Sequence, residues 1–185
     1  SDPGYFLAAS IEEMRHAWQD QQGMITTDDD QMSRQAYMAE IYLLEADGAS
    51  FAVASAYQLR EAGDPRAWDY MTRSPSYGPS AQAFATSLAD AGVTADNPAT
   101  SAQWQDAMRA SFNAWFEETN LVDHYAEFNR NRITDRGQST QLVSAEIAQL
   151  SERLEGLPGG ERPDVYLGHD QVSQAVLAAF DRFPA

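Results

Sequence analysis

The sequence contains no cysteine and no lysine, and it has no long hydrophobic run. Without cysteine, the chain cannot form a disulfide, a zinc–thiolate site or a cysteine nucleophile. Without lysine, neither Schiff-base chemistry nor the phosphate-binding lysine of a P-loop is available. The longest largely apolar stretches, residues 51–57 and 175–180, fall well short of the roughly 18 residues that a membrane helix needs. We therefore expect no membrane insertion.

Acidic residues dominate the charge of the chain. The 185 residues include 28 Asp and Glu against 12 basic residues, all of them arginine, which gives a formal net charge of -16. Such a charge argues against nucleic acid as a ligand, because phosphate binding needs clustered positive charge. Hydrophobic residues still make up 43% of the chain, so a folded core is expected rather than a disordered acidic tail. With no shift in composition along the chain, the sequence predicts a single acidic helical domain over residues 1–185.

The cellular location stays open at this stage. The chain begins at Ser1 without an initiator methionine, and no signal-peptide pattern follows. We expect a soluble protein that is either cytoplasmic or exported after removal of a signal peptide. The use of arginine in place of lysine fits a bacterium with GC-rich genes, but it also fits selection against lysine in a protein delivered into a host cell.

Helical spacing and helix caps recur along the sequence and predict an all-α fold. A capping box at Ser10–Glu13 predicts a helix that ends at Gly23, and a second helix is expected from Thr27 to Gly48. Small residues over 50–62 predict a separate partner helix. Asp64-Pro65, Ser80 and the capping box at Thr100–Gln103 mark three further helix starts, and three more helices are expected from Asn120, from Ser139 or Thr140, and from Asp170.

The expected architecture is an irregular bundle of about eight helices. Proline- and glycine-rich punctuation predicts loops near residues 74–80, 93–99 and 156–163. At most one short extended segment is expected, near residues 164–168.

An acidic cluster around His124 is the best candidate for catalysis. It comprises Glu117, Glu118, Asp123, His124 and Glu127. Neighbouring carboxylates raise the pKa of a histidine and separate their own pKa values, an arrangement that general acid–base catalysis uses. A glycosidase-like pair of carboxylates is therefore conceivable here. An exposed helical turn in a protein of this charge would give the same pattern.

One group of arginines is the candidate ligand-binding site. It consists of Arg130, Arg132 and Arg136. Guanidinium groups bind carboxylates or phosphates in bidentate fashion, so this cluster could clamp an anionic ligand. The simpler interpretation is favourable pairing with the carboxyl end of a helix.

The patterns that could bind a metal are weak, and neither a metal site nor a cofactor is predicted. The run Asp28–Asp30 lacks the alternating ligands of a calcium loop and suits the first turn of a helix. The pair Glu13-x-x-His16 fits half of a di-iron motif, but its second half is missing. His-Glu-x-x-His, Gly-x-Ser-x-Gly and Gly-x-Gly-x-x-Gly are all absent from the sequence.

These observations favour a protein–protein interaction module. An acidic helical surface would attract a basic protein partner, as in an inhibitor, an immunity-type protein or a delivered effector. A small carboxylate-dependent hydrolase acting on a polysaccharide or cell-wall polymer is the alternative. A helical protein that binds a small ligand, with a pocket lined by Trp104, Trp115 and Tyr125, is a third possibility. The sequence does not predict the oligomeric state.

Overall fold

The computed structural model describes the chain except for residues 1, 26–33, 118, 129–165, 168–173 and 175–185. The described residues form six α-helices and no β-strand. The helices are α1 (Pro3–Gln21), α2 (Arg34–Glu61), α3 (Arg66–Met71), α4 (Gly78–Asp90), α5 (Ser101–Glu117) and α6 (Thr119–Phe128). The all-α prediction is confirmed, with six helices in the described residues rather than about eight.

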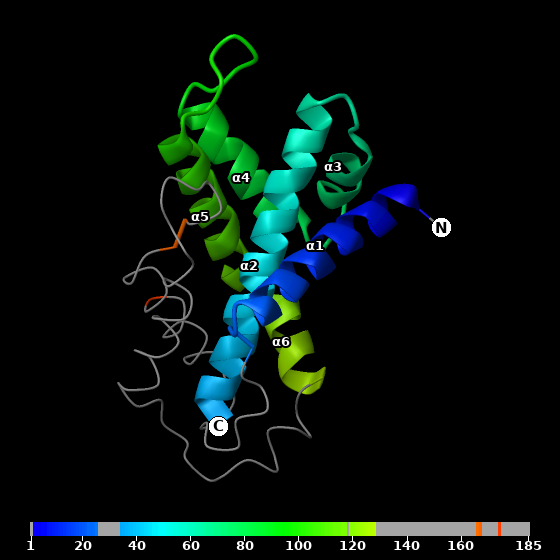
Figure 1. Cartoon of the computed structure of the whole chain (residues 1–185), viewed down its shortest axis with the longest axis vertical. Helices are drawn as coiled ribbons and strands as arrows, with labels where there is room; N and C mark the ends of the chain where they lie inside the picture. Colours follow the sequence, from blue (N-terminus) through cyan, green and yellow to red (C-terminus); the bar gives the residue numbers. More distant parts are fainter. Residues whose placement is uncertain (1, 26–33, 118, 129–165, 168–173, 175–185) are drawn as a thin grey trace.

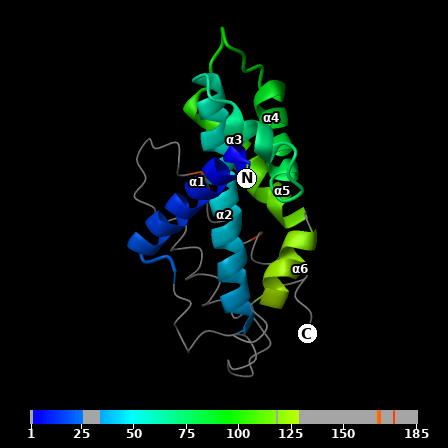
Figure 2. The ribbon, with the colours of Figure 1, turned by 90° about the vertical axis from the view of Figure 1, so that its right-hand side faces the viewer.

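The helix α2 is the centre of the arrangement. In Figures 1 and 2, α4 and α5 lie along one side of α2, while α1 crosses it obliquely on the other side. The helix is rich in alanine, and Ala46, Ala52 and Ala56 are completely buried. Side chains this small let neighbouring helices approach closely. All five other described helices, α1, α3, α4, α5 and α6, therefore pack against α2.

The structure corrects the predicted start of the first helix. The helix begins at Pro3, and Asp2 is its N-cap, with the Asp2 carboxylate accepting a hydrogen bond of 2.8 Å from the backbone N–H of Gly4. The predicted capping box at Ser10 therefore lies inside α1. An aspartate followed by proline is itself a strong start signal, which outweighed the later one. The predicted end is confirmed, since Gly23 has a φ of 68° just after the helix.

The predicted break at Gly48 is also wrong. Residues 34–61 form one continuous helix, so the two helices predicted on either side of Gly48 are a single element. A glycine inside a helix costs only about 1 kcal/mol relative to alanine, which the packing of α2 can offset. The reason for a glycine here is the close approach of α1, whose His16 side chain lies against it.

Other local predictions hold within a residue or two. The capping box at Thr100 is confirmed: the N–H of Gln103 donates to the Thr100 hydroxyl at 3.3 Å, and the Gln103 side chain accepts from the N–H of Thr100 at 2.9 Å. Ser80, which was predicted to start a helix, lies two residues inside α4, because this helix begins at Gly78. Residues 91–100 form the predicted loop, with one isolated bridge between Thr94 and Asn97.

Aromatic rings fill the core between α2 and its neighbours. Tyr57 of α2 contacts Trp68, Phe84 and Trp104, which come from α3, α4 and α5. Phe84 and Trp104 also meet edge to face at a centroid distance of 5.1 Å. Phe112, Trp115 and Phe116 of α5 are buried as well, so the aromatic residues of this helix belong largely to the core.

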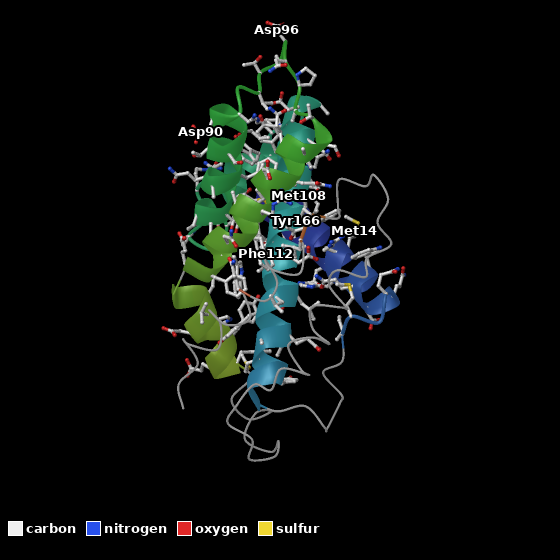
Figure 3. All side chains as sticks on the ribbon, turned by 90° about the vertical axis from the view of Figure 1, so that its left-hand side faces the viewer. Met14, Asp90, Asp96, Met108, Phe112 and Tyr166 are labelled. Atoms are coloured by element: carbon white, nitrogen blue, oxygen red, sulfur yellow. The ribbon has the colours of Figure 1, made fainter. Side chains whose placement is uncertain are left out.

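The structure describes only three residues beyond α6. Tyr166 and Leu167 are buried and not helical, and Figure 3 shows Tyr166 beside Phe112 of α5. The helix predicted from Ser139 or Thr140, the loop at 156–163 and the rest of the segment 164–168 lie outside the described residues. Of the helix predicted from Asp170, only Gln174 is described, and it is helical. Among the residues that are described, no helix is long and apolar enough to cross a membrane.

Candidate metal centre

Three side chains that can bind a metal ion converge where α1 crosses α2. Glu12 and His16 lie one turn apart on the same face of α1, and Glu45 faces them from α2. One donor atom from each residue lies within 4.8 Å of the donor atoms of the other two. Nε2 of His16 lies 3.7 Å from Oε2 of Glu45. All three residues are only partly buried, so the cluster can be reached from solvent.

Gly48 allows this close crossing of the two helices. A Cβ atom placed on Gly48 would lie 2.9 Å from Cε1 and 3.2 Å from Nε2 of His16. It would also lie 3.4 Å from Cγ of Glu12. The imidazole therefore occupies space that any other residue at position 48 would fill. The glycine that interrupts the sequence pattern of α2 is thus explained by the position of His16.

Two tyrosines hold the carboxylates of the cluster. Tyr125 of α6 donates its hydroxyl to Oε2 of Glu45 at 2.6 Å. Tyr77, in the last residue before α4, donates to Oε2 of Glu12. Burial raises the pKa of both tyrosines well above the ordinary value, and the carboxylate that each one faces raises it further. Both therefore act as hydrogen-bond donors at every physiological pH.

The Glu12 carboxyl group has an altered acidity. Burial raises its pKa above the ordinary value of 4.5, the hydrogen bond from Tyr77 opposes this, and the nearby charge of Glu45 raises the pKa again. The charged form of Glu12 is therefore held at a cost in the absence of a positive charge. A cation placed between Glu12 and Glu45 would remove that cost.

A buried ion pair lies directly behind the cluster. Arg15 donates to Asp47 through Nε at 2.8 Å and through Nη2 at 3.1 Å, and both side chains are almost completely buried. Asp47 also accepts hydrogen bonds from Gln19 and from the hydroxyl of Tyr166, each at 2.8 Å. The guanidinium of Arg15 lies 4.0 Å from the ring centroid of Trp18. These contacts fix α1 against α2 in a single register.

The donor set suits a divalent cation. Two carboxylates and one imidazole supply three ligands, which is the number that catalytic metal sites take from the protein while leaving a position open. Two ligands of one ion can be separated by at most about twice a metal–ligand bond, or ~4–5 Å, and the observed 4.8 Å limit lies within that range. The two negative charges would also balance the charge of such an ion. The residues present therefore fit a bound metal ion.

The residues predicted from the sequence lie elsewhere. Glu117 is at the end of α5, while Asp123, His124 and Glu127 are on α6, and all four are exposed. The rings next to His124 are those of Tyr125 and Phe128. The remaining predicted residues, Glu118, Arg130, Arg132 and Arg136, lie outside the described residues, as does Asp28–Asp30. The catalytic and arginine clusters stay predictions.

Sequence reasoning missed Glu12 and Glu45. The sequence pattern pairs His16 with Glu13, at a spacing of three, as half of a di-iron motif. The carboxylate that shares a helix face with His16 is instead that of Glu12, four residues earlier in the chain. The segment Glu12-Glu13-Met14-Arg15-His16 differs from the metallopeptidase pattern His-Glu-x-x-His only at its first position. A search for this pattern with glutamate allowed in place of the first histidine would have identified Glu12 as a candidate ligand.

Two hollows on the described part of the surface lie away from the three donors. One, of about 790 Å³, is lined by Tyr57, Arg60, Leu88 and Trp104, among others, and holds none of the cluster. Another, of about 770 Å³, lies between α1 and α2 and is lined by residues such as Trp18 on a different face of α1.

Comparison with known proteins identifies a family whose model the chain matches. Residues 1–162 match the model of a family described as "Putative metallopeptidase family (DUF6782)". No curated protein and no solved structure matches the chain significantly. The match covers α1 to α6 and therefore all three converging side chains. The chain belongs to this family.

Proposed function

We propose that the protein is a metal-dependent hydrolase that cleaves peptide bonds at the α1–α2 crossing. The observation that carries the proposal is the convergence of Glu12, His16 and Glu45 within 4.8 Å, each with a hydrogen-bonded partner on its outer side. The description of the family supports the same class of reaction.

Each residue of the cluster has a role in this proposal. Glu12, His16 and Glu45 would hold the cation through carboxylate oxygens and Nε2. A divalent cation held there would polarise a carbonyl group and lower the pKa of a bound water molecule. Tyr77 and Tyr125 would keep the two carboxylates oriented, as outer partners of metal ligands do.

Glu13 is the proposed general base. It follows Glu12 directly, it is exposed, and its charge reaches the Glu12 carboxyl. It also occupies the place of the glutamate in His-Glu-x-x-His, which acts as the base in that motif. The Glu13 carboxylate would take a proton from water as the water oxygen attacks the peptide carbonyl carbon. It would then give that proton to the nitrogen of the departing amine as the C–N bond breaks.

The proposal keeps the hydrolase alternative drawn from the sequence but changes its residues and its substrate. The sequence pointed to carboxylates near His124 and to a polysaccharide or cell-wall polymer. The family description favours peptide bonds instead. The interaction module, its basic partner and the small-ligand protein remain predictions without support from the comparison.

Titration with metal ions tests the cation site. Metal-free protein is titrated with Zn²⁺, Mn²⁺ and Co²⁺ by calorimetry, and we expect one site per chain. Replacing Glu12, His16 or Glu45 by alanine is expected to reduce affinity by about 100-fold or more, because a ligand is lost. Glu117→Gln, an exposed carboxylate on α5, is the matched control and should bind as the wild type does. Equal binding by all four variants would refute the proposal.

Peptide cleavage tests the role of Glu13. With a library of fluorescence-quenched peptides, Glu13→Gln should retain cation affinity but lose about 10²–10⁴-fold in kcat, the contribution typical of a general base. A Glu13→Gln variant as active as the wild type would exclude Glu13 from this role. A wild type that binds cations but cleaves no peptide would exclude the peptidase activity while leaving the metal site intact.

A further inference from the structure

A chain of hydrogen bonds runs from His16 into the core behind the candidate centre. Nδ1 of His16 lies 2.8 Å from Oε1 of Gln19, one turn further along α1. Nε2 of Gln19 in turn donates to Oδ2 of Asp47 at 2.8 Å. Gln19 and Asp47 are both completely buried. The imidazole is thus connected through one amide to a buried carboxylate.

The orientation of the Gln19 amide is determined by its partners. Its nitrogen donates to two groups that can only accept, the carbonyl oxygen of Leu44 at 3.1 Å and the Asp47 carboxylate. Its oxygen must therefore face Nδ1 of His16. An amide oxygen only accepts, so Nδ1 must carry the proton that it receives. The neutral imidazole then has no proton on Nε2, the atom that faces Glu45.

Asp47 cannot turn away from Gln19. Arg15 binds both of its oxygens, and the Tyr166 hydroxyl binds Oδ1. The position of Asp47 is therefore fixed by three hydrogen bonds from two residues other than Gln19. A fixed acceptor holds the Gln19 nitrogen in place, and the amide holds the imidazole.

We propose that Gln19, anchored by Asp47, is a positioning residue that keeps His16 in the Nδ1–H tautomer with Nε2 free to bind a cation. This inference rests on the proposed function, since it gives the imidazole its use. Carboxylates and backbone carbonyls usually fill this place beside a metal-binding histidine. Here a neutral amide fills it, and the carboxylate stands one residue further away.

The tautomer of His16 can be measured without a metal ion. The ¹⁵N spectrum of histidine-labelled, metal-free protein distinguishes a protonated Nδ1 from a protonated Nε2, and the His16→Asn variant assigns the signals. We expect His16 in the wild type to be protonated on Nδ1. In Gln19→Met, which has similar volume but no acceptor, the proton should move to Nε2, where Glu45 can accept it.

Cation affinity gives the second readout. Gln19→Met should bind Zn²⁺ about 10–100-fold more weakly, the loss typical of removing an outer partner of a ligand. Leu88→Ala is the control, because it removes a buried side chain of α4 that is not part of the candidate centre. It should lower stability while leaving both the tautomer and the affinity unchanged, which separates positioning from general destabilisation.

The outcomes distinguish the two proposals. A wild-type His16 protonated on Nε2 would overturn the role of Gln19 even if the protein binds cations, and so would a Gln19→Met variant that keeps the Nδ1–H tautomer. The same holds if Gln19→Met binds Zn²⁺ as tightly as the wild type. If the wild type shows the Nδ1–H tautomer and Gln19→Met loses it, but neither binds any cation, the hydrogen-bond chain stands and the proposed function fails.

Discussion

Replacing Gly48 by alanine tests how tightly α1 and α2 approach each other at the candidate centre. The substitution adds one methyl group in the interior of a buried helix. That methyl would lie 2.9 Å from Cε1 of His16, whereas carbon atoms in ordinary contact are about 3.5–4.0 Å apart. The imidazole must therefore move by roughly 0.6 Å or more.

Two opposing effects set the size of the change in stability. Alanine in place of glycine stabilises a helix interior by about 1 kcal/mol. Forcing an extra methyl into a packed contact costs about 1–3 kcal/mol. We therefore expect the variant to be between equally stable and about 2 kcal/mol less stable than the wild type. In a His16→Ala background the clash is absent, because the remaining neighbour, Cγ of Glu12, is 3.4 Å away. There the same change should stabilise the protein by about 1 kcal/mol.

The wild type, Gly48→Ala, His16→Ala and the double variant form a double-mutant cycle. Their urea denaturation is monitored by tryptophan fluorescence in the presence of a chelator, so that all four proteins are metal-free. The coupling free energy between positions 48 and 16 should be about 1–3 kcal/mol. Metal ligands must be placed to within about 0.2 Å, so Gly48→Ala should also weaken Zn²⁺ binding at least tenfold. A variant that is stabilised equally with and without His16, and that binds Zn²⁺ normally, would refute the described crossing.

Two further predictions concern charges near the centre. Asp47→Ala leaves the buried guanidinium of Arg15 without its partner and should reduce the free energy of unfolding, measured by urea denaturation, by about 3–5 kcal/mol. Asp64→Ala breaks an exposed ion pair and should change the urea midpoint little. Glu12 has a raised pKa in the folded protein, so the folded state binds more protons than the unfolded state between the ordinary value of 4.5 and the raised one. The free energy of unfolding of the metal-free wild type should therefore fall as pH rises through this window, and that of Glu12→Gln should fall less. Urea denaturation at a series of pH values measures both, and parallel pH dependences of the two proteins would contradict the raised pKa.

The helices and many of their ends could be predicted because they depend on local signals. The capping box at Thr100 and the glycine after α1 work through hydrogen bonds and backbone angles within a few residues. Local signals failed where two of them competed. Asp2-Pro3 and Ser10 are both good helix starts, and only the first is used. In the sequence Gly48 indicates a helix end, but in the structure it lies inside α2 and makes room for the His16 side chain of α1.

The candidate centre could not be predicted because it depends on the crossing of α1 and α2. Glu45 joins Glu12 and His16 only when the register of the two helices is known, and Arg15 and Asp47 set that register. The strong acidic character of the chain also hid the cluster, since carboxylates at helical spacing occur throughout the sequence. Geometry distinguishes these two glutamates from the others, and composition does not.

The place of Tyr166 bears on where a shorter version of this protein should stop. The family match ends at residue 162, four positions before a ring that is completely enclosed and bonded to Asp47. A version trimmed to the matched region would leave a gap against Phe112 and remove one donor from the carboxylate that anchors Arg15 and Gln19. It would also strip Arg109 of the backbone oxygen that it reaches at 2.7 Å. Boundaries for expression are therefore better set by the buried tyrosine than by the limit of family similarity.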